Sequence, residues 1–414
     1  TRQDIRLAAK FTGGASVEVF TDGATVVLDG DNSGLVSPGG FVFSNTTVIV
    51  SNRYGLGSVR TAPATFWPAQ PFADSQSRLF FDGPAAVTND CALLFDYGCR
   101  VGHRDPSVRF VQANDVTQRH GLSASFRRFA VTNDLTLAAG SRMDLGQGGT
   151  DLLNGARFRV EDGATFRAEG SYGAGTCYIA GDCAGRFVVE QSMKAFVFER
   201  ANVCDGIAEL RYLDASYGRF AVDLNGHDQA LPCLVGNFYW NANQQTLTVT
   251  SAVPATQTLS GAKTAGSRGV AARFLGQVSL AKHGAYTQTV GCAVSTATGT
   301  LTVDGGTLAF ERGAAWTGGD VTVSGDGEIL VRADSVDGAF GSGRKGSPSL
   351  FLNGAGRLNL PEAGDTPLRV RMLSRNGVLL ERGDYSAATC DWIVGAGTVR
   401  VVRGAPKGLI YLIR

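Results

Sequence analysis

The chain of 414 residues contains 55 glycines, and only 18% of its residues are charged. Glycine destabilises helix interiors but suits the turns between short strands, so this composition favours an all-β fold over a helical one. The 38 basic and 37 acidic residues are mixed along the chain and leave a net charge of +1, which excludes the charge field expected of a protein that binds nucleic acid or anionic lipid. No apolar run reaches the roughly 18 residues that a membrane-spanning helix needs, so we expect no membrane insertion of this chain.

A strand–turn–strand pattern recurs along the chain. Apolar residues occupy alternate positions, a glycine-containing turn follows, and a second alternating run completes the repeat, as expected for strands with one buried face. In "GTLTVDGGTLAFERG" (299–313) we expect Gly305 and Gly306 to form the turn. The residues of this copy that are predicted to face the core are Leu301, Val303, Leu308 and Phe310. Other clear copies begin at Val17, Leu135, Phe158, Val321 and Leu350.

The repeats begin at intervals of about 20 to 33 residues, which is typical of the coils of a solenoid. The simplest fold of this kind is a right-handed parallel β-helix, in which successive coils stack about 4.8 Å apart. Residues 52–125 show weaker repetition and predict irregular, loop-rich coils. The segment after Pro361 suggests a terminal β element that covers the last coil. We therefore expect a solenoid over residues 1–360 and a C-terminal capping element over residues 361–414.

Eight cysteines form no CxxC motif and no cluster with the four histidines, so the sequence predicts neither a metal site nor a cofactor. An even number of cysteines is typical of an oxidising compartment. Two local bridges, Cys91–Cys99 and Cys177–Cys183, are one expectation. The alternative is that cysteines about one repeat apart, such as Cys177 and Cys204, stack in the core as small apolar residues.

The densest group of polar side chains lies in the irregular region. Parallel β-helix enzymes that cleave polysaccharides place acidic and basic residues on one outward face, where carboxylates act as acid and base or bind calcium and arginine neutralises a uronate. A carbohydrate site is therefore one hypothesis for this region. Ordinary turn chemistry, as in "GHRDPS", is the alternative. The group contains His103 and Arg104 together with the candidate catalytic residues Asp96, Asp105, Asp115, Arg119 and His120.

Two shorter motifs also suggest binding. The stretch "NFYWNAN" (237–243) brings Tyr239 and Trp240 together, as platforms that stack on sugar rings do. Neighbouring strand residues face opposite sides, so packing in the core or at a coil edge is the alternative. The tripeptide Arg382–Gly383–Asp384 matches an integrin-binding motif, but a match of three residues is not specific.

Three segments resemble a known family. "FLGQVSLAKHGAYTQTVGCAVSTATGTLTVDGGTLAF" (274–310) resembles the autotransporter-associated β-strand repeat, with its Leu-x-Lys-x-Gly segment followed by Gly-x-Leu-x-Val. "FAVDLNGHDQALPCLVG" (220–236) resembles a turn found in the same surface proteins, and "VLLERGDYSAATCDWIVGAGTVRVV" (378–402) resembles their C-terminal module. The resemblance implies a secreted or cell-surface bacterial β-helix of the passenger type. It implies no catalytic residues.

Two functions remain open at this point. The first is a non-catalytic extracellular stalk or adhesin that binds polysaccharides or the glycans of host or environmental surfaces through repeated contacts, and that can self-associate along the solenoid. The second is a carbohydrate-active β-helix enzyme, a polysaccharide lyase or glycoside hydrolase, with its site in residues 90–120. An enzyme requires either convergent carboxylates about 5–10 Å apart or a base beside arginines in one groove, and a stalk requires neither.

Overall fold

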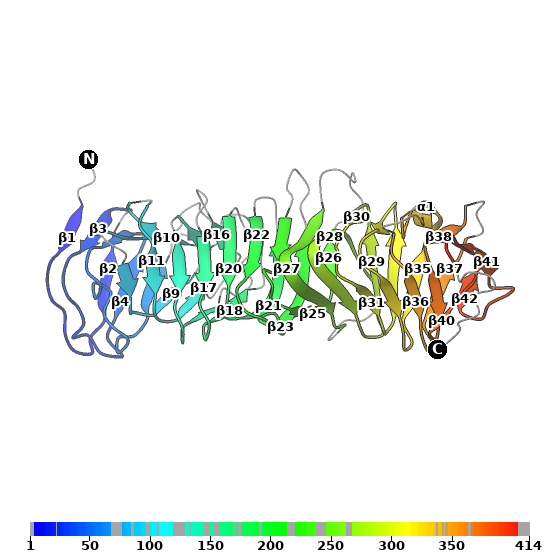
Figure 1. Cartoon of the computed structure of the whole chain (residues 1–414). Helices are drawn as coiled ribbons and strands as arrows, with labels where there is room; N and C mark the ends of the chain where they lie inside the picture. Colours follow the sequence, from blue (N-terminus) through cyan, green and yellow to red (C-terminus); the bar gives the residue numbers. More distant parts are fainter. Residues whose placement is uncertain are drawn as a thin grey trace. The chain divides into compact units, whose positions relative to one another are not determined.

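The computed structural model is almost entirely β, with parallel strands stacked as a β-solenoid of about 12 turns (Figure 1). The contacts divide the chain into two units, Thr1–Ile207 and Ala208–Arg414. The predicted all-β parallel β-helix is confirmed, while the right-handed sense of the coil and the boundary at 360/361 stay predictions. The structure describes residues 4–21, 23–67, 77–83, 87–96, 99–105, 107–118, 129–132, 134–144, 150–152, 157–168, 171–172, 175–189, 193–212, 220–236, 246–261, 267–336, 338–341, 343, 347–362 and 366–404.

The first unit is built from three parallel sheets, and each coil from β7 to β18 adds a short strand to each of them (Figure 1). The first sheet contains β1 (Ile5–Leu7), β3 (Thr25–Leu28), β5 (Thr47–Val50), β7 (Ser77–Phe81), β10 (Cys99–His103), β13 (Phe129–Val131) and β16 (Thr150–Leu152). The second contains β2 (Val17–Phe20), β4 (Phe41–Ser44), β6 (Ala64–Trp67), β9 (Leu93–Phe95), β12 (Val116–Gln118), β15 (Arg142–Asp144), β18 (Thr165–Ala168), β21 (Asp182–Val189) and, beside it, β19 (Ser171–Tyr172). The third contains β8 (Val87–Asn89), β11 (Phe110–Gln112), β14 (Leu135–Leu137), β17 (Arg157–Val160), β20 (Gly175–Ile179) and β22 (Met193–Phe198).

The second unit has the same parallel stacking. β24 (Phe220–Asp223) and β25 (Gln229–Leu231) pair with β27 (Leu247–Leu259), which pairs with β28 (Ser267–Lys282). Two ladders continue from β28: β31 (Leu301–Val303), β34 (Val321–Val323), β36 (Leu350–Leu352) and β39 (Leu373–Arg375) form one, and β29 (Thr287–Gly291), β32 (Thr307–Glu311), β35 (Glu328–Val331), β37 (Arg357–Leu360) and β42 (Ile393–Gly395) form the other. The remaining elements are β23 (Gly206–Tyr212), β26 (Leu234–Gly236), β30 (Val294–Ser295), β33 (Ala315–Trp316), the short helix α1 (Ala333–Val336), β38 (Leu368–Val370), β40 (Val378–Leu379), β41 (Gly383–Ser386) and β43 (Thr398–Val401).

The core follows from the alternation of side chains along each strand. In β4, Phe43 is buried, and Val42 and Ser44 lie on the outer face. The register places Phe43 beside Phe66 of β6, and Phe66 beside Phe95 of β9. The three rings stack with centroids 5.2 Å and 4.8 Å apart, close to the strand spacing of a sheet. A continuous aromatic ladder therefore fills the interior beneath the second sheet.

The repeat at 299–313 has the predicted form. Its four predicted core residues, Leu301, Val303, Leu308 and Phe310, are all buried. Gly306 has φ +60° in the turn between β31 and β32, and a Cβ there would lie 2.4 Å from the carbonyl oxygen of Gly284. Gly305 has no such φ, and a Cβ added to it would lie 3.0 Å from the amide nitrogen of Gly284. The turn thus requires glycine most strictly at Gly306.

The C-terminal part of the second unit changes the strand pattern. β41 pairs antiparallel with β43, which pairs in parallel with β38, and β40 folds back antiparallel on β39. Antiparallel strands end the succession of parallel coils here. That this part caps the solenoid stays a prediction.

Candidate functional site

The three described carboxylates of the candidate catalytic set lie at three different corners of the solenoid. Asp96 follows β9 and precedes the next strand of the first sheet, Asp105 lies between β10 and β11, and Asp115 lies between β11 and β12. Each corner connects a different pair of sheets, so the fold does not bring these carboxylates together on one face. Arg119 and His120 lie outside the described residues.

Two of these carboxylates accept local hydrogen bonds. The Asp105 carboxylate accepts hydrogen bonds from the hydroxyl and the backbone N–H of Ser107, at 2.7 Å and 2.9 Å, and these bonds lower the pKa of Asp105. Asp115 accepts a hydrogen bond of 2.8 Å from the backbone N–H of Arg142, on the next coil. His103 lies beside Asp105, with its Nδ1 3.0 Å from the backbone nitrogen of that residue. These are contacts of turns and coil edges, which agrees with the turn interpretation of the sequence.

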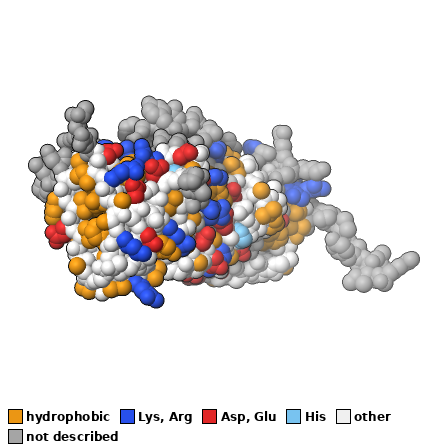
Figure 2. All heavy atoms as spheres, turned by 90° about the vertical axis from the view of Figure 1, so that its left-hand side faces the viewer, with side chains coloured by type: hydrophobic (Ala, Val, Ile, Leu, Met, Phe, Trp, Pro, Cys, Tyr) orange, Lys and Arg blue, Asp and Glu red, His pale blue; other side chains and the backbone are white. Residues whose placement is uncertain are grey.

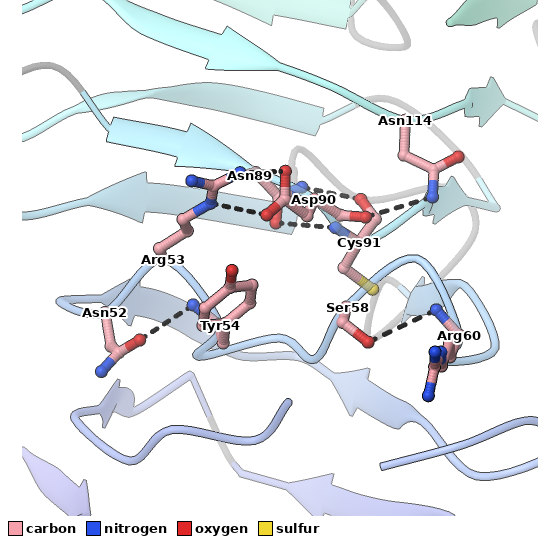
Figure 3. A network of polar contacts seen from close by, with 9 residues as sticks. All are labelled: Asn52, Arg53, Tyr54, Ser58, Arg60, Asn89, Asp90, Cys91 and Asn114. Carbon is pink, nitrogen blue, oxygen red and sulfur yellow. Dashed lines mark hydrogen bonds and ion pairs between the residues drawn. The ribbon is translucent and has the colours of Figure 1, made fainter. Parts of the chain in front are cut away.

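The main polar network of this region is centred on Asp90, which the sequence interpretation did not single out. Arg53, in the connection between β5 and β6, donates from Nε and Nη2 to the two carboxylate oxygens of Asp90, at 2.6 Å and 3.0 Å (Figure 3). The Arg53 guanidinium also lies 5.4 Å from the centroid of the Tyr54 ring. The bond to Asp90 raises the pKa of Arg53. Asp90 is nearly buried, and each of its two carboxylate oxygens accepts a hydrogen bond from Arg53.

A pair of inward-facing amides continues this network into the core. Asn89 donates from Nδ2 to the Gln112 side-chain oxygen at 2.9 Å and to the carbonyl of Cys91 at 2.8 Å. Gln112 in turn donates to the carbonyls of Cys91 and Asn114 at 3.0 Å and 2.9 Å. Asn114 donates to the carbonyl of Asp90 (Figure 3). The side chains of Asn89 and Gln112 are fully buried. Their hydrogen bonds therefore avoid the free-energy cost of burying polar atoms without a partner. The signal in the sequence is an amide at an inward position of each strand, in "VTN" and "FVQ".

The second unit contains a buried lysine in the segment that resembles the surface-protein repeat. Lys282 is fully buried, and its ammonium donates to the carbonyls of His283, Gly284 and Gly305 at 2.8, 2.9 and 2.9 Å. It lies 3.9 Å from the centroid of the Tyr286 ring. Burial lowers the pKa of Lys282 to about 8, against the opposing effect of Asp304 and Asp326. The lysine of the Leu-x-Lys-x-Gly segment therefore ties together the turns of two successive coils.

The cysteines do not form the predicted bridges. None of the eight forms a disulfide in the structure, including Cys91, Cys99, Cys177 and Cys183. Cys177 lies in register between Phe158 and Phe196, and Cys183 beside Phe166, so each fills a core position among aromatic rings. Cys177 also does not stack on Cys204 in the sheet register, because the residue of β22 that pairs with Cys177 is Phe196, and Cys204 lies after that strand. Packing as a small apolar residue is the outcome at these sites.

The structure describes the other predicted binding motifs only in part. Tyr239 and Trp240 lie outside the described residues. In the tripeptide, Asp384 pairs with Arg400 at 2.7 Å within the antiparallel sheet. Within the described parts of the chain, no group of three or more His, Cys, Asp or Glu side chains is arranged to hold a metal ion. The described residues also include no helix that is long and apolar enough to cross a membrane.

Comparison with protein-family models, with curated proteins and with solved structures finds no match to this chain. The resemblance to autotransporter-associated repeats therefore stays a prediction, and the parallel β-solenoid is the level at which the architecture is established.

Proposed function

We propose that this chain is a secreted or cell-surface protein without catalysis, whose rigid β-solenoid presents glycan-binding contacts on its outer faces. The observation that supports this most is the use of the outward charges. Several of them pair from one coil to the next, as expected of charges that hold the coils in register.

Examples of such pairing occur in both units. Arg157 binds Asp134 at 2.5 Å, and its pKa is raised by that bond. Arg332 bridges Glu311 and Glu362, at 3.5 Å and 3.1 Å. A glycoside hydrolase of the common type needs two carboxylates that face one substrate and are not neutralised by such partners. The separation of Asp96, Asp105 and Asp115 onto three corners does not meet this requirement.

A solenoid of this kind would act by reach and by multivalency. Because the coils repeat at a fixed spacing, weak sites on successive coils are held at a fixed distance from one another. Binding one part of a long polymer then raises the effective concentration of the next part, so overall avidity can exceed each single affinity by about 10²–10⁴.

The test is a screen against soluble neutral and acidic polysaccharides, with binding and cleavage measured on the same samples. Retention in affinity electrophoresis reports binding. New reducing ends and the ultraviolet absorbance of unsaturated products report hydrolase and lyase cleavage. We expect retention by at least one polysaccharide and no cleavage product. Cleavage that is lost in Asp115→Asn or Asp105→Asn would establish the enzyme instead, and the absence of retention by every polymer would overturn glycan binding.

A further inference from the structure

Two exposed aromatic side chains lie in one column on the outer face of the second sheet. Phe20 ends β2 and is 68% exposed, and Trp67 ends β6 and is 42% exposed. The register pairs Phe20 with Ser44 and Ser44 with Trp67, so the three residues follow one another across β2, β4 and β6. We call these three residues the aromatic column. Among the side chains whose exposure the structure describes, no other aromatic residue is exposed to this degree.

The column is held on a rigid support. On the inner face of β4 and β6, the rings of Phe43 and Phe66 stack on one another, and Phe66 stacks on Phe95 of the neighbouring strand β9. Phe66 and Trp67 are adjacent in β6, so one ring is locked in the core while the next is presented to solvent. Hydrophobic side chains are visible in several places at this end of the molecule (Figure 2). Burying exposed rings of this size against a flat apolar surface is favourable, and a rigid support reduces the entropy lost on binding.

The spacing and the chemistry fit one class of ligand. Strands in a sheet are about 4.8 Å apart, so Phe20 and Trp67, two strands apart, are separated by roughly 9.6 Å along the solenoid axis. This is about the repeat of two sugar rings in an extended polysaccharide chain. The faces of sugar rings carry C–H groups that stack on aromatic rings, and their hydroxyl groups at the edge require hydrogen-bond partners. Ser44 lies between the two aromatic residues, and Glu18 and Thr65 occupy outward positions on the same strands.

The charge of this face selects among polysaccharides. On β2, β4 and β6, the outward charged residue is Glu18, and no Lys or Arg lies among the residues of these strands. Carboxylates accept hydrogen bonds from hydroxyl groups but repel uronates and sulfates. We propose that the aromatic column is a stacking platform for a neutral, extended polysaccharide that runs along the solenoid axis across β2, β4 and β6. This inference rests on the proposed glycan-binding function and assigns it a location.

The experiment uses the full chain and neutral β-linked gluco-, xylo- and manno-oligosaccharides of increasing length, with polygalacturonate as the acidic polymer. Isothermal titration calorimetry measures affinity for the wild type, Phe20→Ala, Trp67→Ala and the double variant. Val59→Ala is the matched control, because Val59 is 66% exposed and lies outside the column. We expect affinity to rise until the ligand spans both rings. Each single variant should weaken binding roughly tenfold and the double variant about a hundredfold, with no effect of the control.

The outcomes separate this inference from the proposed function. If the wild type binds neutral oligosaccharides and the double variant binds equally well, the platform is wrong but glycan binding stands. A wild type that retains only acidic polymer contradicts the platform as well. If the wild type binds no glycan, the glycan-binding function and the stacking platform are both wrong. Trp67→Phe, which keeps a ring at the same place, should retain most of the affinity. The thermal midpoint of each variant shows whether it is folded. If the Phe20→Ala and Trp67→Ala double variant does not fold, the double variant Phe20→Gln with Trp67→Gln takes its place.

Discussion

Arg53 and Asp90 are 37 residues apart in the sequence and are joined by two hydrogen bonds of 2.6 Å and 3.0 Å. The Asp90 side chain is 11% exposed and that of Arg53 is 54% exposed. We expect Asp90→Asn to lower the free energy of unfolding by about 1–2 kcal/mol. The variant loses a charge-assisted bidentate pair, while Arg53 can still turn toward water. Denaturant or thermal unfolding of the first unit measures this.

The matched control is Asp82→Asn. Asp82 pairs with Arg104 at 3.1 Å through one bond, and both side chains are about half exposed. An exposed pair of this kind contributes about 0.2–1 kcal/mol, so the control should change stability less than Asp90→Asn does. Equal losses in the two variants would contradict the view that burial and bidentate geometry make the Asp90 pair the stronger one.

The turn at 305–306 gives a second prediction. We expect Gly306→Ala to destabilise the chain by roughly 1–3 kcal/mol, because Gly306 has φ +60° and an added Cβ would overlap the carbonyl oxygens of Gly284 and Tyr286. Gly305→Ala is the control, since its nearest neighbour to an added Cβ is 3.0 Å away and its φ is not restricted. The difference between the two thermal midpoints is the measurement. A larger loss for Gly305→Ala would show that the turn is built differently.

Such local features are what the sequence predicts well. The burial of Leu301 and Phe310 and the special backbone of Gly306 depend on alternation and on turn chemistry within fifteen residues. The stacking of coils follows from repetition of the same pattern. Each copy of the repeat therefore carries the pattern from which the solenoid fold can be predicted.

The arrangement of the candidate site depends on distances that the sequence does not display. Asp96, Asp105 and Asp115 are close in the chain, but strands of three to five residues separate them, and each connection turns to a different sheet. These three residues, which are close in the sequence, therefore lie at different positions around the coil. Conversely, Phe20 and Trp67 are distant in sequence and share one column, because the register of β2, β4 and β6 aligns their positions. Both the separation of the three carboxylates and the alignment of Phe20 with Trp67 depend on the number of residues in each coil, which the repeat pattern alone does not give.

The Tyr286 ring gives a third prediction. Its hydroxyl is buried and has no hydrogen-bond partner, and burial raises the pKa of Tyr286 well above its ordinary value. We expect Tyr286→Phe to stabilise the chain by about 1 kcal/mol, because it removes an unsatisfied polar atom and keeps the ring that faces the Lys282 ammonium. Thermal unfolding of the second unit measures the change.

Tyr385→Phe is the control for this substitution. The Tyr385 hydroxyl donates a hydrogen bond of 2.9 Å to the carbonyl of Glu381, so its removal should cost about 0.5–1.5 kcal/mol. Opposite signs for the two variants are expected. Destabilisation by Tyr286→Phe would mean that the hydroxyl has a partner, such as a buried water.

The final prediction concerns the thiols and tests the disulfide question directly. Six cysteines are buried, and burial raises the pKa of Cys91 to about 12, so its reactive thiolate is scarce at pH 8. Cys292 and Cys390 are partly exposed. Treatment of the native, non-reduced protein with iodoacetamide at pH 8 should therefore modify these two first, and the other six only after unfolding, as mass spectrometry of the peptides will show. In the unfolded, non-reduced protein all eight should react. Peptides that remain linked as Cys91–Cys99 or Cys177–Cys183 would overturn the free-thiol core and restore the bridges that the sequence first suggested.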